Sequence, residues 1–355
     1  MASARKRLVR GSSSVAKKPA IRSCRKEALR PRQTAGTGRS AEELDPGSNC
    51  ASTPRSLKIC CPSGGALTAQ VGGKESPEVT ATQDRRKVGA NAEVWCRARE
   101  ILESEGLVIL RGLIPHRVVS AARKRLLQEL AEAGALREDT PLEEARVSAG
   151  CLESKIAMPS LLRRLDLQAL PQVVAVLEHA SLFNATSRLM QAKEVVTTAY
   201  KWLRAVPPGT FTGPHMDRAY VGDGRRLTAW IPFGKVEAGE KALGSLCWIP
   251  GSHRDPSVIE RYKDYRRAGT DGERSGWLAA DPGALELPPS CSWRSADFAP
   301  GDVAVFGMDL LHTTVPNGTD SFRISCDTRW QPLGDPPPAE VVVGPWRRSR
   351  SRKSL

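Results

Sequence analysis

The stretch "GDVAVFGMDLLHTTVPNGTDSFRIS", from Gly301 to Ser325, has apolar and β-branched residues on both sides of an Asn-Gly pair. Asn-Gly between two such runs is the strongest short signal for a two-residue β-hairpin loop, because a type I′ turn needs residues that tolerate positive φ. We therefore expect two antiparallel strands joined at Asn317-Gly318.

The register of this hairpin places a histidine opposite an arginine. Counting back from the turn, Thr314 pairs with Ser321, and His312 pairs with Arg323. Cross-strand partners share one face of a sheet, with Cβ atoms about 5 Å apart. Thr314 and Ser325 are then near neighbours on that face. The pattern predicts an imidazole beside a guanidinium.

Further short β-branched and aromatic runs recur from residue 195 onward, separated by Pro and Gly. They occupy residues 195–206, 227–233, 245–250, 303–306 and 322–330. Helical periodicity precedes them, over residues 94–106, after Pro115 and over residues 171–191, with an apolar run at 107–114 typical of a buried strand. Helices followed by many short strands predict a mainly β sandwich or barrel braced by N-terminal helices.

A second stretch, "GPHMDRAYVG" at residues 213–222, places His215 and Asp217 two positions apart. In an extended segment residues i and i+2 point to the same face, so both side chains would project together. One imidazole and one carboxylate do not complete a site. A non-haem Fe(II) centre takes two imidazoles and one carboxylate, and we place the second imidazole at His312.

Arg323 adds the prediction of a cosubstrate. A guanidinium binds a carboxylate through two parallel N–H groups. A 2-oxo acid with a second carboxylate can chelate a metal at one end and reach such an arginine with the other. On the residues alone a simpler interpretation stays open, in which Arg323 is a surface strand residue paired with Asp320 or Asp327.

With these residues in place, the chain resembles the phytanoyl-CoA dioxygenase family of Fe(II)/2-oxoglutarate oxygenases. It carries, in the family's order, "PHMD", "WIPF", "LCWIPGSHR", "PGDVAVFGMDLLHTTVPN" and "FRIS". The resemblance covers roughly residues 95–332, and the combination is far more specific than any single motif. It implies a double-stranded β-helix, a jelly-roll barrel, in agreement with the predicted strands.

The resemblance also implies roles for individual residues. His215, Asp217 and His312 match the iron ligands, and the second His-x-Asp triplet at His253 falls in a turn with no metal role. Halogenating relatives lack the carboxylate, so the presence of Asp217 favours hydroxylation.

For the cosubstrate, Arg323 matches the residue that binds the 5-carboxylate of 2-oxoglutarate. Thr314 matches a small hydroxyl residue near that carboxylate, and Trp230 matches a Trp that lines the cosubstrate pocket. All three side chains are therefore expected around one ligand.

The implied function is that of an Fe(II)- and 2-oxoglutarate-dependent dioxygenase. Such an enzyme uses O2, hydroxylates a small or lipid-like organic substrate, and releases succinate and CO2. Two alternatives stay open. One is a cupin-like metalloenzyme that does not use 2-oxoglutarate, against which Arg323 argues. The other is a non-catalytic binding module whose basic tails dock to acidic partners or membrane surfaces.

The positive charge of the chain lies in its two ends. The formal net charge is +14, yet residues 1–90 hold 18 Lys and Arg against 7 Asp and Glu, and the last ten residues add five basic groups and no acid. Residues 91–345 have 30 basic and 32 acidic groups, which argues against a dedicated nucleic-acid-binding domain. We predict a disordered basic region (1–89), an oxygenase domain (90–333) and a basic tail (334–355).

Composition also indicates the compartment. No run of 18 apolar residues is present, so no transmembrane segment is expected, and the N-terminus lacks the apolar stretch of a secretory signal. Nine Cys without a CxxC pair fit reduced thiols. We expect an intracellular protein, cytoplasmic, or organellar if the basic N-terminus is a transit peptide. A small-molecule substrate is the expected partner, and no signal indicates the oligomeric state.

Overall fold

The computed structural model describes the backbone of residues 59–60, 68–70, 85–153, 161–162, 164–222, 224–239, 241–262, 276–280, 282–336 and 346–348, and the side chains of those between 92 and 336. All of these belong to one compact unit, Leu44–Leu355. Most of the predicted disordered region and of the basic tail lies outside the described residues. The first helix begins at Arg85, ahead of the predicted domain boundary at residue 90.

The helices lie before the strands and between them along the chain. They are α1 (Arg85–Glu105), α2 (His116–Glu132), α3 (Ala149–Leu152), α4 (Leu165–Gln168), α5 (Pro171–Leu177), α6 (Ala180–Leu189), α7 (Arg218–Val221) and α8 (Pro256–Arg261). The apolar stripe predicted after Pro115 is confirmed, because α2 buries Val119, Ala122, Leu126, Leu127 and Leu130.

One predicted helix is divided in the structure. The periodicity over residues 171–191 predicts a single helix, but α5 ends at Leu177 and α6 begins at Ala180. His179 lies between them in an extended conformation, with φ −62° and ψ 142°. Its imidazole accepts a hydrogen bond from the Ser181 N–H at 3.2 Å and so caps α6.

The strands form two sheets. In the larger the order is β12 (Trp346–Arg348), β4 (Val195–Thr198), β11 (Arg323–Pro332), β6 (Leu227–Pro232), β9 (Val303–Gly307), β3 (Leu107–Arg111) and β2 (Thr68–Gln70), with β5 (Trp202–Val206) also paired to β11. In the smaller it is β1 (Ile59–Cys60), β8 (Trp293–Ser295), β7 (Leu246–Trp248) and β10 (His312–Thr314). Apart from β1–β8 and β2–β3, the described pairings are antiparallel, which confirms a mainly β fold.

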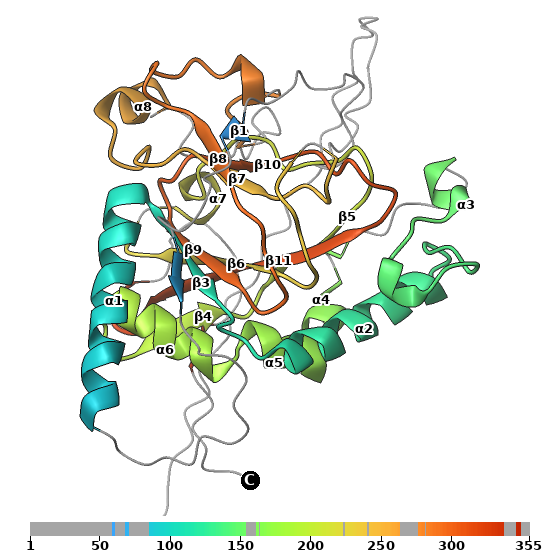
Figure 1. Cartoon of the computed structure of the whole chain (residues 1–355), viewed down its shortest axis with the longest axis horizontal. Helices are drawn as coiled ribbons and strands as arrows, with labels where there is room; N and C mark the ends of the chain where they lie inside the picture. Colours follow the sequence, from blue (N-terminus) through green and yellow to red (C-terminus); the bar gives the residue numbers. More distant parts are fainter. Residues whose placement is uncertain are drawn as a thin grey trace, which may run out of the picture. The chain divides into compact units, whose positions relative to one another are not determined.

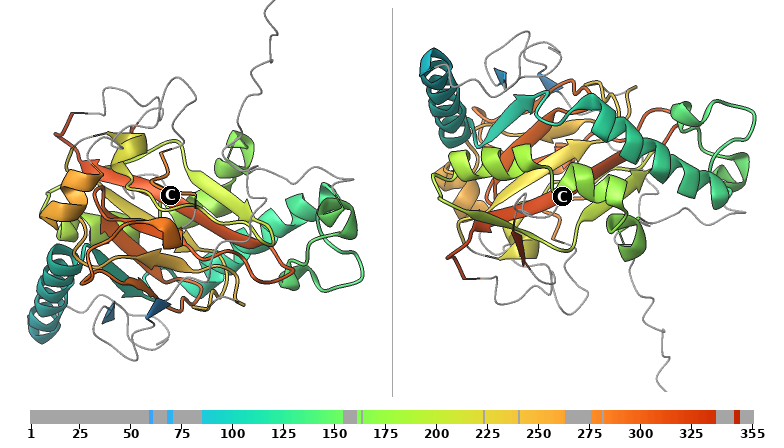
Figure 2. Two further views of the ribbon diagram at one scale, coloured as in Figure 1. Left: turned by 90° about the horizontal axis from the view of Figure 1, so that it is seen from above. Right: turned by 90° about the horizontal axis from the view of Figure 1, so that it is seen from below.

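The two sheets and the helices are stacked in layers (Figures 1 and 2). Trp248 of the small sheet belongs to the same buried cluster as Trp230 and Phe306 of the large sheet. On the opposite face of the large sheet, Phe183 of α6 packs its ring edge-on against Trp330 of β11, with centroids 4.8 Å apart. The large sheet is therefore covered by the small sheet on one face and by helices on the other.

The long strand β11 divides its side chains between these layers, because successive residues of a strand point to opposite faces. Trp330 points to the helices. Arg329, on the other face, reaches Asp217 between the sheets. By the same alternation Arg323, Ser325 and Asp327 also face the space between the sheets.

The hairpin predicted at Asn317-Gly318 is wrong. β10 pairs with β7 in the small sheet, whereas β11 pairs with β4, β5 and β6 in the large sheet. His312 consequently faces Trp248, and Arg323 faces Val206. Residues 315–322 form a loop that crosses from one sheet to the other.

The buried side chain of Asn317 explains why this loop does not close as a type I′ turn. Its Nδ2 donates to the carbonyl oxygens of Val206 (3.0 Å) and Ser321 (2.7 Å), and its Oδ1 accepts from the Thr319 N–H (3.1 Å). Neither Asn317 nor Gly318 adopts the positive φ that a type I′ turn requires. Long-range hydrogen bonding of Asn317 therefore overrides the local turn signal.

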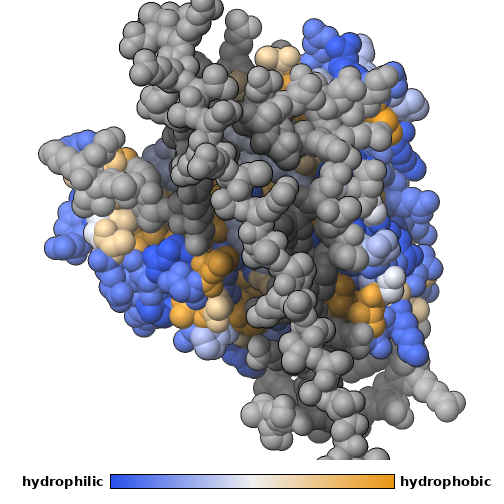
Figure 3. All heavy atoms as spheres, turned by 180° about the vertical axis from the view of Figure 1, so that it is seen from behind, coloured by the Kyte–Doolittle hydropathy of each residue, from blue (hydrophilic) through white to orange (hydrophobic). Residues whose placement is uncertain are grey.

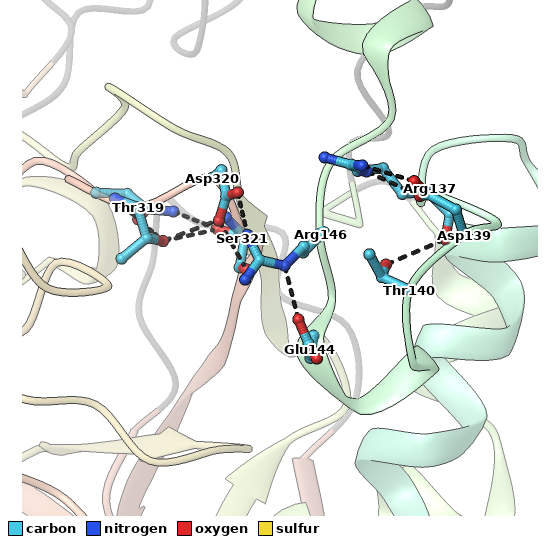
Figure 4. A network of polar contacts seen from close by, with 9 residues as sticks. Arg137, Asp139, Thr140, Glu144, Arg146, Thr319, Asp320 and Ser321 are labelled. Atoms are coloured by element: carbon cyan, nitrogen blue, oxygen red, sulfur yellow. Dashed lines mark hydrogen bonds and ion pairs between the residues drawn. The ribbon is translucent and has the colours of Figure 1, made fainter.

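The crossing loop is also fastened from outside by the segment before α3 (Figure 4). The N–H of Val147 donates to the carbonyl of Asp320 (2.9 Å), and the N–H of Phe322 donates to that of Ala145 (2.8 Å). Arg146 forms ion pairs with Glu144 and Asp320. The start of β11, and with it Arg323, is thereby held in place.

The described surface is largely polar. In the rear view of Figure 3, hydrophilic residues cover most of the coloured surface, and hydrophobic residues form small separate patches. Leu152 and Leu165 are the exposed large hydrophobic residues within the described ranges. Among the helices that the structure describes, none combines the length and apolarity that a membrane span needs.

Candidate metal centre and cosubstrate site

His215, Asp217 and His312 converge between the two sheets. Each offers one ligand atom, and these atoms lie within 4.8 Å of one another. The Oδ1 of Asp217 is 3.6 Å from Nε2 of His215 and 3.9 Å from Nε2 of His312. All three residues are at least 95% buried. The structure thus brings together the three side chains that the sequence predicts as a metal site.

The backbone around the triplet differs from the expected extended segment. His215 is paired with His312 in an isolated antiparallel bridge. Asp217 has helical dihedral angles (φ −60°, ψ −22°) and precedes α7. The carboxylate therefore reaches the two imidazoles from the start of a helical turn, and the prediction of an extended conformation is wrong at Asp217.

Both imidazoles are oriented by backbone carbonyls. Nδ1 of His215 is 2.7 Å from the oxygen of Gly213, and Nδ1 of His312 is 2.9 Å from that of Leu310. A carbonyl oxygen only accepts, so each Nδ1 donates its proton and each Nε2 keeps a free lone pair. Burial, together with the neighbouring His215, lowers the pKa of His312 to about 3, so its ring is neutral at ordinary pH.

The carboxylate of Asp217 is held by two side chains of the large sheet. Its Oδ1 accepts from Nη2 of Arg329 at 2.9 Å, and its Oδ2 accepts from Oγ1 of Thr228. Burial by itself raises the pKa of Asp217, but the charge of Arg329 outweighs it and holds the pKa below its ordinary value. The carboxylate is therefore ionised and available as an anionic ligand.

Sequence reasoning did not identify Arg329 or Thr228. A signal for Arg329 was present, because it lies six positions after Arg323 and an even spacing within one strand puts both on the same face. Thr228 had no comparable signal, since its contact with Asp217 depends on the pairing of β6 with β11.

Arg323 is buried and only partly satisfied. Its Nη1 donates to the carbonyl of Gly244, while Nε and Nη2 have no acceptor among the described residues. These two N–H groups lie along one edge of the guanidinium, the edge that binds a carboxylate through two parallel hydrogen bonds. Burial lowers the pKa of Arg323 to about 10, so the group stays charged at neutral pH. The edge fits a carboxylate ligand.

The simpler interpretation of Arg323 as a surface residue is excluded. Asp327 pairs with Arg204 at 3.3 Å, and Asp320 pairs with Arg146. Arg323 itself is 1% exposed. An exposed ion pair therefore does not account for it.

Two more buried polar atoms without a described partner accompany Arg323: Oγ of Ser325 and Nε1 of Trp248. Ser325 is two residues after Arg323 on β11, and Trp248 is the strand partner of His312. Thr314, on the same face of β10 as His312, accepts from the Thr212 N–H at 2.9 Å and retains its own hydroxyl proton. The space between the sheets thus offers several donors to an anion.

Trp230 lies on the inner face of β6, two residues from Thr228. Its ring packs edge-on against Phe298, with centroids 4.9 Å apart. This contact places Trp230 in the core between the sheets, and its role at a cosubstrate stays a prediction.

The second His-x-Asp triplet is separate from this cluster. Nε2 of His253 is 3.0 Å from the carbonyl oxygen of Glu103, and Asp255 caps α8 by accepting from the Ser257 and Val258 N–H groups. Its predicted position in a turn agrees with the structure, where residues 251–254 form a turn ahead of α8.

Residues 102–325 match the family model described as Phytanoyl-CoA dioxygenase (PhyH). The 1-deoxypentalenic acid 11-beta-hydroxylases of Streptomyces arenae and Streptomyces exfoliatus are each 26% identical over 241 residues, which cover 65% of this chain and 78% of theirs.

Solved structures with a similar chain course include AviO1 from Streptomyces viridochromogenes Tue57, with a TM-score of 0.44 and 22% identity over 73% of this chain and 100% of that one. EvdO2 from Micromonospora carbonacea var. aurantiaca, complexed with 2-oxoglutarate, has a TM-score of 0.41 and 23% identity, and the match covers 74% of this chain and 98% of that one. The carbocyclase SnoK from nogalamycin biosynthesis has a TM-score of 0.44 and 17% identity, and the match covers 66% of this chain and 83% of that one.

Proposed function

The chain belongs to the phytanoyl-CoA dioxygenase family, and from this premise we propose that His215, Asp217 and His312 bind Fe(II) while Arg323 binds the 5-carboxylate of 2-oxoglutarate. The protein is an iron- and 2-oxoglutarate-dependent dioxygenase, with O2 as the other cosubstrate. The assignment of residues to these ligands is supported by their geometry.

The three buried side chains fit a non-haem iron. Two neutral imidazoles with free Nε2 lone pairs and one ionised carboxylate are the donor set that Fe(II) takes in such oxygenases. Iron supplies the redox chemistry with O2 when it is bound. The protein contributes the fixed imidazole orientation and a site closed to bulk water.

The observation that carries the cosubstrate assignment is the open edge of Arg323. A buried cation with two N–H groups that lack an acceptor is costly unless a ligand completes it. A dicarboxylic 2-oxo acid does so with its far carboxylate. We assign Ser325, Trp248 and Thr314 to the surroundings of that carboxylate, and Trp230 to the wall of the pocket.

The reaction we infer is hydroxylation of a small or lipid-like organic substrate. One oxygen atom of O2 enters the substrate as a hydroxyl group, and the other enters succinate as 2-oxoglutarate loses CO2. Two hydroxylases named for the organic acid 1-deoxypentalenic acid are relatives of the chain, and this supports a small organic substrate. The carboxylate at Asp217 favours hydroxylation over halogenation.

We also infer that the two facing sheets form a jelly-roll, the double-stranded β-helix, within an oxygenase domain over residues 90–333. The mainly antiparallel pairing supports this topology, as does a loop over residues 315–322 that crosses between the sheets.

The experiment is an anaerobic titration of the full chain with Fe(II) and then 2-oxoglutarate, monitored by the visible charge-transfer band that the two give together. We expect a band that needs both additions and is lost in H215A and D217A. The matched control is H253A, which removes the histidine of the second His-x-Asp triplet and keeps the band.

Two outcomes contradict the proposal. A wild-type protein that binds Fe(II) but gives no band with 2-oxoglutarate is a cupin-like metalloenzyme. A wild-type protein that binds no metal is a non-catalytic binding module.

A further inference from the structure

The two oxygens of Asp217 are held by the two members of a single cross-strand pair. Arg329 of β11 and Thr228 of β6 are directly opposite in the antiparallel register. Arg329 donates to Oδ1 at 2.9 Å, and Thr228 donates to Oδ2. Both donors are buried residues within strands. The carboxylate is thereby fixed in position and in rotation about its own axis.

The surroundings of Arg329 show that the residue is directed at Asp217. Arg329 is 2% exposed, and its guanidinium carbon lies 4.4 Å from the ring centroid of Trp202. In the one ion pair that the structure describes for Arg329, the partner is Asp217. The Nε and Nη1 of Arg329 have no acceptor among the described residues. Burying a charge with open N–H groups favours the fold less than an apolar pair of similar volume. The contact that compensates the burial of Arg329 in part is its ion pair with the Asp217 carboxylate.

The side chains of Arg329 and Thr228 act together as a clamp on the Asp217 carboxylate. The clamp determines which oxygen of Asp217 faces the imidazoles. Oδ1 lies 3.6 Å and 3.9 Å from the two Nε2 atoms, whereas Oδ2 is engaged by Thr228. A carboxylate oxygen has two lone pairs, so Oδ1 can bind Arg329 and a metal together. A carboxylate without the clamp is free to rotate and to bind a metal through both oxygens.

We propose that Arg329 and Thr228 are positioning residues that restrict Asp217 to one-oxygen ligation and so keep a coordination position available for the cosubstrate. The proposal rests on the proposed function, because it takes Asp217 as an iron ligand. An octahedral iron held by two imidazoles and one carboxylate oxygen would keep three positions open, two for a 2-oxo acid and one for O2. A second oxygen from Asp217 would take one of them.

The test compares R329M and T228V with wild type in anaerobic titrations with Fe(II) and then 2-oxoglutarate. At Fe(II) concentrations that saturate each variant, both are expected to raise the Kd of 2-oxoglutarate about tenfold or more. The charge-transfer band is expected to move to longer wavelength in R329M, because Asp217 donates more strongly to iron without the opposing cation. A purely structural role would lower the melting temperature without moving the band.

Three further variants sharpen the result. T228S keeps the hydroxyl and is expected to restore wild-type affinity. R111M removes a cation from β3 of the same sheet, where Arg111 pairs with Asp302 and not with Asp217, and is expected to stay within about twofold of wild type. T228V, close in shape to threonine, carries the test if R329M does not fold.

The outcomes separate the two proposals. If wild type gives no band, the proposed function fails. If wild type gives the band, and R329M and T228V show the wild-type Kd and band position, the clamp is wrong. It is equally wrong if R111M shifts the Kd of 2-oxoglutarate and the band position as much as R329M, because the effect is then one of general charge.

Discussion

His312 and His215 lie opposite each other and are hydrogen-bonded in both directions, with N–H to O distances of 2.9 Å and 3.1 Å. Residues paired in this way carry their side chains on the same face. Their ring centroids are 4.1 Å apart, and both Nε2 atoms approach the same oxygen of Asp217. The relation between the two imidazoles is thus set by backbone pairing between distant segments.

Replacing Arg323 is expected to separate charge from geometry at the cosubstrate. R323K keeps a cation but loses the paired N–H groups of Nε and Nη2, so we expect the Kd of 2-oxoglutarate to rise about 10- to 100-fold. Fe(II) affinity stays near wild type, because Arg323 does not contact the triad in the described hydrogen bonds. Titrations followed by the charge-transfer band measure both the Kd of 2-oxoglutarate and the affinity for Fe(II).

R204K is the matched control for this change, since Arg204 lies on the neighbouring strand β5 and pairs with Asp327. It is expected to alter the Kd of 2-oxoglutarate by less than about threefold. An R323K protein with the wild-type Kd would show that the 5-carboxylate binds elsewhere.

Removing the amide of Asn317 is expected to loosen the loop that crosses between the sheets. N317A leaves the carbonyl groups of Val206 and Ser321 without their donor, at a cost of about 2–4 kcal/mol in the free energy of unfolding. N317D is at least as destabilising, because a carboxylate then faces both carbonyl oxygens. Chemical denaturation measures the loss.

The exposed Asn184 provides the comparison, since its side chain accepts from Arg188 at the surface of α6. N184A is expected to cost less than about 0.5 kcal/mol. Equal losses for the two variants would mean that Asn317 does not anchor the loop.

A methyl group at Gly213 is expected to disturb the first imidazole. A Cβ there would lie 2.4 Å from Cδ2 of Trp277, and the carbonyl of Gly213 accepts the Nδ1 proton of His215. G213A is therefore expected to weaken Fe(II) binding about tenfold. The double variant G213A/W277A is expected to recover most of that affinity, because removing the indole makes room for the methyl group.

Gly307 is the control glycine, because a Cβ there meets no atom within 4 Å and its φ is not positive. G307A is expected to bind Fe(II) like wild type. If the effects of G213A and W277A simply add in titrations of the double variant, the indole is not the cause.

The cap of α6 is expected to depend on pH. Burial lowers the pKa of His179 below its ordinary value, and its imidazole accepts from the Ser181 N–H. In the unfolded chain this histidine takes up a proton at a higher pH than in the folded protein. Its contribution to stability is therefore complete above pH about 6.5 and is lost as the pH falls below that value.

H179N retains a capping side chain that does not titrate, so its stability is expected to change less between pH 7.5 and 5.5 than that of wild type. The difference at the acidic end is bounded by the value of a cap, about 1 kcal/mol. Melting curves at both pH values measure it, and parallel curves for the two proteins would contradict the role of His179.

The gathering of the candidate site residues in one buried place was largely predictable from sequence. His215, Asp217, His312 and Arg323 are ordered along the chain as the motifs indicate, and the structure buries all four between the sheets. The main runs of strand residues were also predictable, because alternation and β-branched composition are local properties.

The partners of these strands were not predictable. The Asn-Gly signal favours a local hairpin, yet the Asn317 amide binds the carbonyl of Val206, 111 positions earlier in the chain. The energy of that buried contact is invisible in a short window of sequence. The predicted pairing of His312 with Arg323 failed for this reason.

By itself the sequence determined which groups are available: two imidazoles, a carboxylate and a guanidinium in strand-rich surroundings. Only the tertiary structure decided that His215 lies opposite His312, that Asp217 reaches them from a helical turn, and that Arg329 and Thr228 hold its two oxygens. The entropic cost of closing a loop changes slowly with its length, so distant strands compete as partners on nearly equal terms. Burial of the assembled core then selects among them.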